Sequence, residues 1–382
     1  MLLYLTFAIS FFILFYFFSR IRSSEFIVVG VILSIYHFTL GYLNSTAAKN
    51  KTVDSISYYN WGTTTAINNF DFSIGSAFIV HLVSWLNPIF SSFELMSAFF
   101  CGLTLFVFLK ILEFIYREKM VKSINNKEFF LLLILLFIPG FHYWTVSLGK
   151  DSLILLAIFF GILSIYRKNI FIFLVSCILM LFVRIHIFAL FIICLFISEF
   201  FYCQFNFLRL KKIIYKSLLF LISFPFTIGM FVFLFNYIQR YSSEGFSNID
   251  EFLDGRAEVY ADLGSGAWLS VQPYPIKVFA FIFGGVPWVS IDVLTIFSML
   301  EGLIVFFLSC TFFMKLKQNF STYDLNYKAL ITFISLFIII LILFFALTNN
   351  NLGVMVRMKV MIYSPLIFLG IITFSKKNTL RG

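Results

Sequence analysis

Apolar residues follow one another in long runs along almost the whole chain, with short polar segments between them. A helix that crosses the hydrocarbon core of a bilayer needs about 20 mostly apolar residues. The pattern predicts eleven transmembrane helices, at 2–18, 26–43, 92–116, 129–147, 151–166, 169–183, 187–203, 217–237, 292–314, 328–348 and 358–374. We therefore expect an all-α polytopic membrane protein with a single integral-membrane domain over 1–382.

Lys and Arg residues predict the orientation of these helices, because they concentrate in cytoplasmic loops. With the N-terminus outside and the C-terminus inside, the inner segments hold 18 of the 28 Lys and Arg residues. The first apolar run is followed by Arg20 and Arg22 and is preceded by no positive charge. A secretory signal carries its charge on the other side, so we expect this run to be a retained span.

Two further apolar stretches, 75–90 and 276–290, are short for a membrane crossing, and each contains a proline. If both crossed, the inner side would hold 12 basic residues and the outer side 15, against the positive-inside rule. We expect interfacial or re-entrant helices on the outer face instead. They belong to two outer loops, a first over 44–91 and a larger one over 238–291.

The amino-acid composition excludes several classes of protein. Of the 382 residues, 61% are apolar and 12% are charged, and the mean hydropathy is +0.99. A soluble domain or nucleic-acid-binding module is excluded, although the isoelectric point is about 9.3. The chain contains no nucleotide-binding loop and no metal-ligand or paired-cysteine signature, so we expect no nucleotide cofactor and no tightly bound metal.

The basic residues that run against the inner-positive trend include Lys150, Arg184, Arg256, Arg357 and Lys359. Ionisable groups near the hydrocarbon are costly and mark binding sites or pathways. Snorkelling towards the headgroups explains any one of them, but a cluster on one face is harder to explain that way. Because guanidinium groups bind phosphate oxygens in a bidentate manner, the cluster indicates an outer phosphate ligand.

Lys150 and Asp151 open a predicted helix. Asp151 is expected to cap the first backbone amides of that helix. A cation at the same place opposes the helix dipole. A bound anion would explain Lys150, because helix N-termini favour phosphate.

The run 169–203 would form one helix of about 50 Å, too long for one crossing, so a turn is expected at Arg184–His186, although it has no Gly or Pro. His186 could act as an acid or base beside a bound phosphate, or could be a hydrogen-bonded turn residue. Asp54, early in the first outer loop, could be a general base or a solvated loop residue.

Aromatic and histidine side chains on the outer face could bind sugars. Tryptophan and tyrosine rings suit a membrane interface as well as the apolar face of a polar ligand, so both roles stay open. The candidates are His142, Trp144, Tyr260, Trp268 and Tyr274.

Several short strings in this order resemble bacterial polysaccharide repeat-unit polymerases of the O-antigen (Wzy) type. They are Asp54 with Tyr58-Tyr59, Phe141-His142-Tyr143-Trp144 leading to Gly149-Lys150-Asp151, Arg184-Ile185-His186, Pro273-Tyr274-Pro275 leading to Gly285-Val286-Pro287-Trp288, and Arg357. Ile185 is a departure, since many relatives have proline there.

The resemblance implies a GT-C-like glycosyltransferase in the bacterial cytoplasmic (inner) membrane, with its active site facing the periplasm. Such enzymes use undecaprenyl-pyrophosphate-linked oligosaccharides as donor and acceptor and release undecaprenyl pyrophosphate. Membrane lipid and a chain-length regulator are the further partners, and no nucleic acid is expected. Arg184, His186 and Asp54 would be catalytic. The substrate-binding candidates are Lys150, Asp151, Arg256, Arg357, Lys359, His142, Trp144, Tyr260, Trp268 and Tyr274.

Three alternatives remain open at this point. A lipid-linked oligosaccharide flippase would also bind a pyrophosphate, but transporters place polar sites near the midplane, often between inverted repeats. An O-antigen ligase would share the outer loops and basic residues. A membrane acyltransferase would need a stronger catalytic histidine motif within a span.

Overall fold

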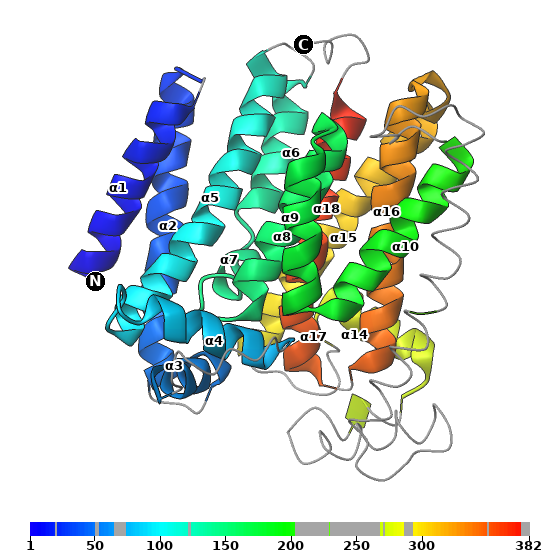
Figure 1. The fold of residues 1–382 in the computed structure, drawn as a ribbon. Helices are drawn as coiled ribbons and strands as arrows, with labels where there is room; N and C mark the ends of the chain where they lie inside the picture. The colour runs from blue at the N-terminus through cyan, green and yellow to red at the C-terminus, as the bar shows by residue number, and fades with distance from the viewer. Residues whose placement is uncertain are drawn as a thin grey trace. The chain divides into compact units, whose positions relative to one another are not determined.

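The computed structural model describes residues 1–19, 21–49, 53–64, 74–120, 124–202, 229, 268–269, 272–285, 293–349 and 351–375. Every regular element in these ranges is helical (Figure 1), which confirms the all-α class for this part of the chain. The span expected at 217–237 and the candidate residues Arg256 and Tyr260 lie outside the described residues.

Within the described residues, six helical segments are long and apolar enough to cross a membrane. They are Ser24–Lys49 (α2), Phe93–Met120 (α5), Ile185–Tyr202 (α10), Thr295–Thr322, Leu325–Thr348 (α16) and Leu352–Phe374. The segment Thr295–Thr322 consists of most of α15 (Val293–Asn319) and a 3-10 turn, Phe320–Thr322. The segment Leu352–Phe374 consists of α17 (Leu352–Met358) and α18 (Val360–Phe374). This set supports a polytopic membrane protein.

The span expected over 129–147 is divided between two helices, so one continuous helix there is wrong, and the crossing itself stays a prediction. Helix α6 (Asn126–Leu136) ends after 11 residues, and a short helix α7 (Pro139–Tyr143) follows. Proline has no backbone N–H to donate to the preceding turn of a helix, but it is well suited to the first position of a new one. Pro139 stands at the start of α7 for this reason.

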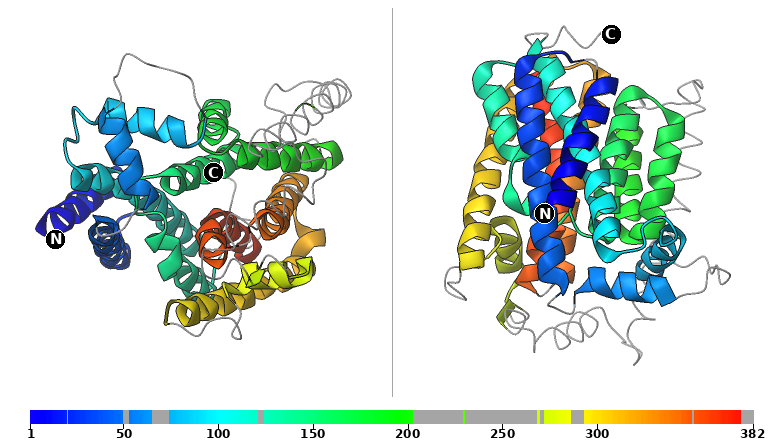
Figure 2. Two further views of the ribbon diagram at one scale, coloured as in Figure 1. Left: turned by 90° about the horizontal axis from the view of Figure 1, so that it is seen from below. Right: turned by 90° about the vertical axis from the view of Figure 1, so that its left-hand side faces the viewer.

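The two short apolar stretches do form short helices. Helix α4 (Ser76–Leu86) has 11 residues and α14 (Tyr274–Phe283) has 10. At about 1.5 Å per residue, neither reaches across a hydrocarbon core of about 30 Å. Helix α4 and the preceding α3 (Asp54–Thr64) lie across the direction of α2 and α5 (Figures 1 and 2). Their interfacial placement stays a prediction.

The chain divides into two compact units. Unit 1 consists of Met1–Ile185 and Tyr363–Gly382, and unit 2 of His186–Ile362. In unit 1, α5 packs against α1 (Leu2–Phe18), α2, α6 and α8 (Lys150–Arg167). The residue after α18 also contacts α5, because Ser375 Oγ donates to Glu118 Oε2 at 2.7 Å.

In unit 2, the short helix α14 packs against α15, α16 and α17. The Ser198 hydroxyl of α10 donates to the Ala329 carbonyl oxygen of α16 at 2.7 Å. Rings of Phe191, Phe333 and Phe337 pack edge-to-face in the same interior, with centroids 5.0 and 5.3 Å from Phe191.

Candidate functional site

Arg184 lies at a break between two helices. Helix α9 (Ile170–Val183) ends at Val183, and α10 begins at Ile185. Arg184 between them has an extended backbone, with φ −151° and ψ 89°, and its N–H still donates to Met180 O at 2.8 Å. The interruption of the helix expected here is confirmed, and a single extended residue makes it without glycine or proline. A tight hairpin at this point stays a prediction.

Arg184 forms a buried ion pair with Asp151. Its Nη2 atom lies 2.7 Å from Asp151 Oδ1, and the two side chains are only 9% and 2% exposed. The expected capping role of Asp151 is wrong, because Gly149 holds the cap position and Asp151 is the second residue of α8. A carboxylate in the first turn is still favoured by the helix dipole, and the guanidinium neutralises it.

The residue that precedes α4, Gly75, lies close to the end of α9 and to Lys150. Gly75 N–H donates to Phe182 O of α9 at 2.8 Å, and a β-carbon built on Gly75 would lie 3.8 Å from Lys150 Nζ. Gly75 has φ +81°, a backbone conformation that glycine adopts far more readily than other residues. The start of α4 therefore lies against the end of α9 and beside Lys150.

Helix α3 contributes Tyr58. Its hydroxyl lies 3.5 Å from Ser76 Oγ, and its ring would lie 3.7 Å from a β-carbon at Gly149. Tyr58, Gly75, Lys150, Asp151 and Arg184 therefore gather where α8 begins, and we call them the α8 start cluster. It holds two cations and one carboxylate, a net charge of +1, at the positive end of a helix.

This arrangement suits a phosphate-bearing ligand. The N-terminus of a helix attracts anions through its backbone amides and dipole. Lys150 is half-buried and places a second cation near the Arg184–Asp151 pair. Asp54, the other catalytic candidate of unit 1, is the exposed first residue of α3, one helical turn before Tyr58.

His142, a predicted substrate-binding residue, is buried in the interior of unit 1. It is fully buried, and its Nδ1 atom lies 2.8 Å from Nδ1 of the equally buried His37. The phenyl ring of Phe108 stacks on His142, with centroids 4.0 Å apart. Trp144, two residues on, is half-buried and contacts Tyr143 edge-to-face at 5.2 Å.

Backbone carbonyl oxygens face the histidine pair from both sides. His142 Nε2 lies 2.8 Å from the Leu136 carbonyl oxygen, so it must donate and its Nδ1 accepts when the ring is neutral. His37 Nε2 lies 3.2 Å from the Cys101 carbonyl oxygen and 2.9 Å from Thr104 Oγ1. This pair could not be predicted from the sequence, because the two histidines are 105 positions apart and no local pattern links them.

The unit 2 candidates make contacts of their own. The His186 ring stacks on Phe344 of α16, with centroids 5.5 Å apart. Tyr274 Oη donates to Leu343 O at 2.6 Å, and buried Lys359 donates from Nζ to Ile282 O at 3.0 Å, near the end of α14. Arg357 is half-buried in the last turn of α17, and Trp268 is also half-buried.

The structure thus brings together three of the predicted residues within unit 1, namely Lys150, Asp151 and Arg184. It also gives structural partners to His142, Tyr274 and Lys359. Comparison with known proteins gave no match of the chain to a family model, a curated protein or a solved structure.

Proposed function

We propose that the protein is a membrane glycosyltransferase that polymerises undecaprenyl-pyrophosphate-linked oligosaccharide repeat units. The observation that carries this proposal is the α8 start cluster, where Lys150 lies beside the buried Arg184–Asp151 ion pair at a helix N-terminus. A buried charge pair is costly to maintain. A site that must bind a lipid-borne pyrophosphate gives a reason for keeping it.

The proposed reaction is a glycosyl transfer in which the pyrophosphate of the donor is an already activated leaving group. A hydroxyl of the acceptor sugar attacks the anomeric carbon of the donor, and the bond from that carbon to the pyrophosphate oxygen breaks. The electron pair leaves with undecaprenyl pyrophosphate, and the hydroxyl proton passes to a base. Arg184 and Lys150 stabilise the negative charge on the departing pyrophosphate, where water is excluded and such charges act most strongly.

Asp54 is our candidate base from unit 1, and His186 is the alternative from unit 2. Asp151 is a positioning residue that holds the Arg184 guanidinium by its 2.7 Å ion pair. Lys359 is not needed in this scheme, because its ammonium already binds the Ile282 carbonyl oxygen.

The proposal includes the topology. Eleven spans in the bacterial inner membrane, with the N-terminus outside, would put the α8 start cluster on the periplasmic face. The long-chain product would form there from units that a flippase has already delivered. A chain-length regulator would be a separate partner.

The experiment is a gene deletion with complementation, read as a glycan ladder and as the location of single repeat units. A polymerase deletion leaves single units displayed outside, and complementation restores the ladder. Repeat units trapped on the inner leaflet would indicate a flippase, and polymer that forms but is not transferred to lipid A core would indicate a ligase. Either result contradicts the proposal.

Variants at the site sharpen the test. Arg184→Ala should abolish chain lengthening while the protein stays in the membrane. Lys127→Gln is the matched control, because Lys127 is an exposed basic residue of the same unit, outside the cluster. Normal long-chain glycan with Arg184→Ala would remove Arg184 from the mechanism.

A further inference from the structure

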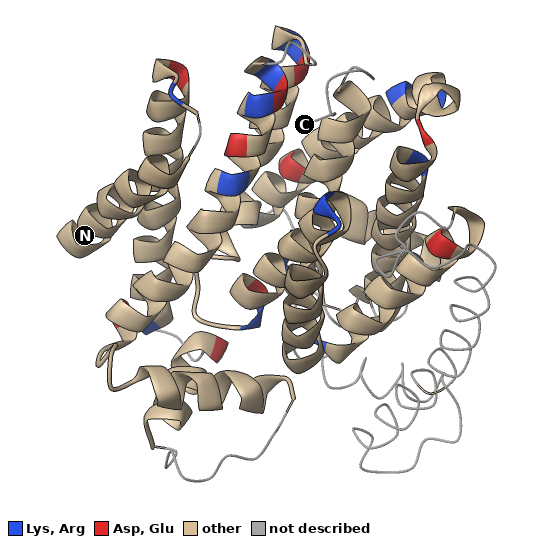
Figure 3. Cartoon of the chain, turned by 45° about the horizontal axis from the view of Figure 1, so that its top comes forward, with Lys and Arg blue, Asp and Glu red and all other residues tan. Residues whose placement is uncertain are grey.

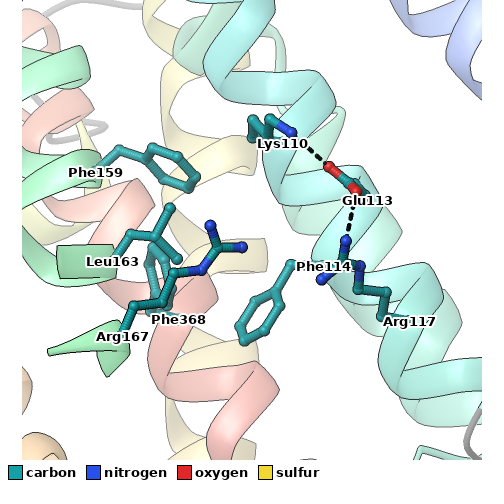
Figure 4. Close-up of a pocket in the computed structure, with 8 residues that line it drawn as sticks. All are labelled: Lys110, Glu113, Phe114, Arg117, Phe159, Leu163, Arg167 and Phe368. Atoms are coloured by element: carbon teal, nitrogen blue, oxygen red, sulfur yellow. Dashed lines mark hydrogen bonds and ion pairs between the residues drawn. The ribbon is translucent and has the colours of Figure 1, made fainter. Parts of the chain in front are cut away.

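A second group of charges lies in unit 1 near the C-terminal ends of α5 and α8. Figure 3 shows charged residues gathered over the second half of α5. A shallow, open pocket lies between this part of α5, the end of α8 and α18. The residues that line it are Lys110, Glu113, Phe114, Arg117, Phe159, Leu163, Arg167 and Phe368 (Figure 4).

Cations outnumber carboxylates in this pocket by three to one. Glu113 is 5% exposed and uses both of its oxygens, with Lys110 Nζ 2.8 Å from Oε2 and Arg117 Nη2 2.9 Å from Oε1. The Arg167 guanidinium points into the pocket from the opposite side (Figure 4). It makes no hydrogen bond or ion pair with another residue that the structure describes.

Helix dipoles explain only part of this arrangement. Arg117 and Arg167 stand in the last turns of α5 and α8, where cations are favoured. Lys110 is ten residues before the end of α5, about 15 Å along the helix, so the dipole does not account for it. Its ammonium lies 5.0 Å from the centroid of the Phe15 ring and 5.7 Å from that of Phe106.

The apolar walls of the pocket strengthen the attraction between its cations and an anion. Phe159 and Phe368 pack against each other with centroids 5.4 Å apart, and Phe114 packs on Phe368 at 5.8 Å. Apolar walls lower the local dielectric, so an anion held at the mouth of the pocket beside these rings would be attracted more strongly than one in water. Guanidinium groups such as Arg167 bind phosphate oxygens in a bidentate manner.

We propose that this pocket binds a phosphate group, with Arg167 as its main contact and Lys110 and Arg117 as supporting charges. The group can come from the headgroup of an anionic phospholipid or from a soluble phosphate. Basic pockets between membrane-spanning helices are suited to anionic lipid headgroups. The site is separate from the α8 start cluster, which lies at the other end of α8, and it does not depend on the proposed function.

The experiment is native mass spectrometry of the detergent-purified full chain, titrated with phosphatidylglycerol and with phosphatidylcholine. Wild-type protein should bind phosphatidylglycerol more tightly, and Arg167→Gln should weaken that binding about fivefold to tenfold. Lys127→Gln, which removes an exposed charge outside the pocket, should leave it unchanged. Glu113→Gln should tighten it, because Lys110 and Arg117 would no longer neutralise a carboxylate.

Inorganic phosphate identifies the source of the ligand. If millimolar phosphate binds in an Arg167-dependent manner and displaces the lipid, the natural ligand is a soluble phosphate. If it does not displace the lipid, the ligand is a headgroup. Equal phosphatidylglycerol affinity for wild type, Arg167→Gln and Lys110→Gln, with no Arg167-dependent binding of inorganic phosphate, would overturn the proposal.

Discussion

Asp151 and Arg184 are joined by a buried ion pair, with 2.7 Å between Oδ1 and Nη2, although they lie 33 positions apart in the chain. The pair links the first turn of α8 to the residue that ends α9. Helices α8 and α9 run next to each other along unit 1, so this bond fixes the ends of two neighbouring helices. Lys150 and Gly75 are held at the same point.

Removing either partner should destabilise unit 1. Asp151→Asn and Arg184→Ala each leave one buried charge without compensation, and we expect a loss of about 3–5 kcal/mol in the free energy of unfolding. The paired substitution, Asp151→Leu with Arg184→Met, should cost much less than the sum of the two losses. Denaturant titration of purified protein in mixed micelles measures all three, and strictly additive losses would mean that the pair is not coupled.

The histidine pair should behave as one hydrogen-bonded unit. His142→Phe leaves buried His37 Nδ1 without its hydrogen-bond partner, and we expect a loss of about 1–3 kcal/mol. Thr104→Val removes the hydroxyl that lies 2.9 Å from His37 Nε2 and should cost less, about 1 kcal/mol, because Nε2 keeps its contact with Cys101 O.

The proton order gives a spectroscopic check on this pair. Nitrogen chemical shifts of labelled histidine should show a proton on Nε2 of His142. The reverse tautomer at His142 would contradict the hydrogen bond to Leu136 O.

Gly75→Ala should disturb the approach of α4 to Lys150. An alanine β-carbon has room, since the nearest atom would lie 3.8 Å away, but φ +81° is strained for any residue with a β-carbon. We expect a cost of about 1–2 kcal/mol. Ser76→Ala is the control, because it changes the neighbouring residue and removes only a 3.5 Å contact with Tyr58. Equal stability of the two variants would show that the conformation at Gly75 is not required.

Lys359→Met tests whether this residue is structural. Its ammonium binds the Ile282 carbonyl oxygen, and a hydrogen bond from a charged group contributes about 1.5–3 kcal/mol. We expect a less stable unit 2 with chain lengthening retained in the protein that remains folded. A variant of unchanged stability that makes no polymer would instead assign Lys359 to the substrate.

Hydropathy predicted most of the helices because membrane-spanning segments must be apolar along their length. The break at Arg184 was also predictable, since one helix over 169–203 would be too long for one crossing. The end of α6 was missed. The hydropathy of 129–147 stays high through Pro139, and only the proline itself signals the break at which α7 begins.

The site was predictable only in part. Lys150 stood out because a cation opposes the helix dipole at that position. The partner of Asp151 could not be predicted, because an N-cap and an ion pair require the same carboxylate and only the tertiary structure distinguishes them. His37 and Lys359 show the same limit, since their partners are a distant histidine and a backbone carbonyl group.

The most direct test of the central claim is release of undecaprenyl pyrophosphate by the purified protein in nanodiscs supplied only with lipid-linked repeat units. We predict a glycan ladder and stoichiometric release for wild type and Lys127→Gln. Arg184→Lys keeps the charge but loses the bidentate guanidinium, and it should release little. Full release and a normal ladder with Arg184→Lys and Arg184→Ala, or no release by the folded wild-type protein, would contradict the account.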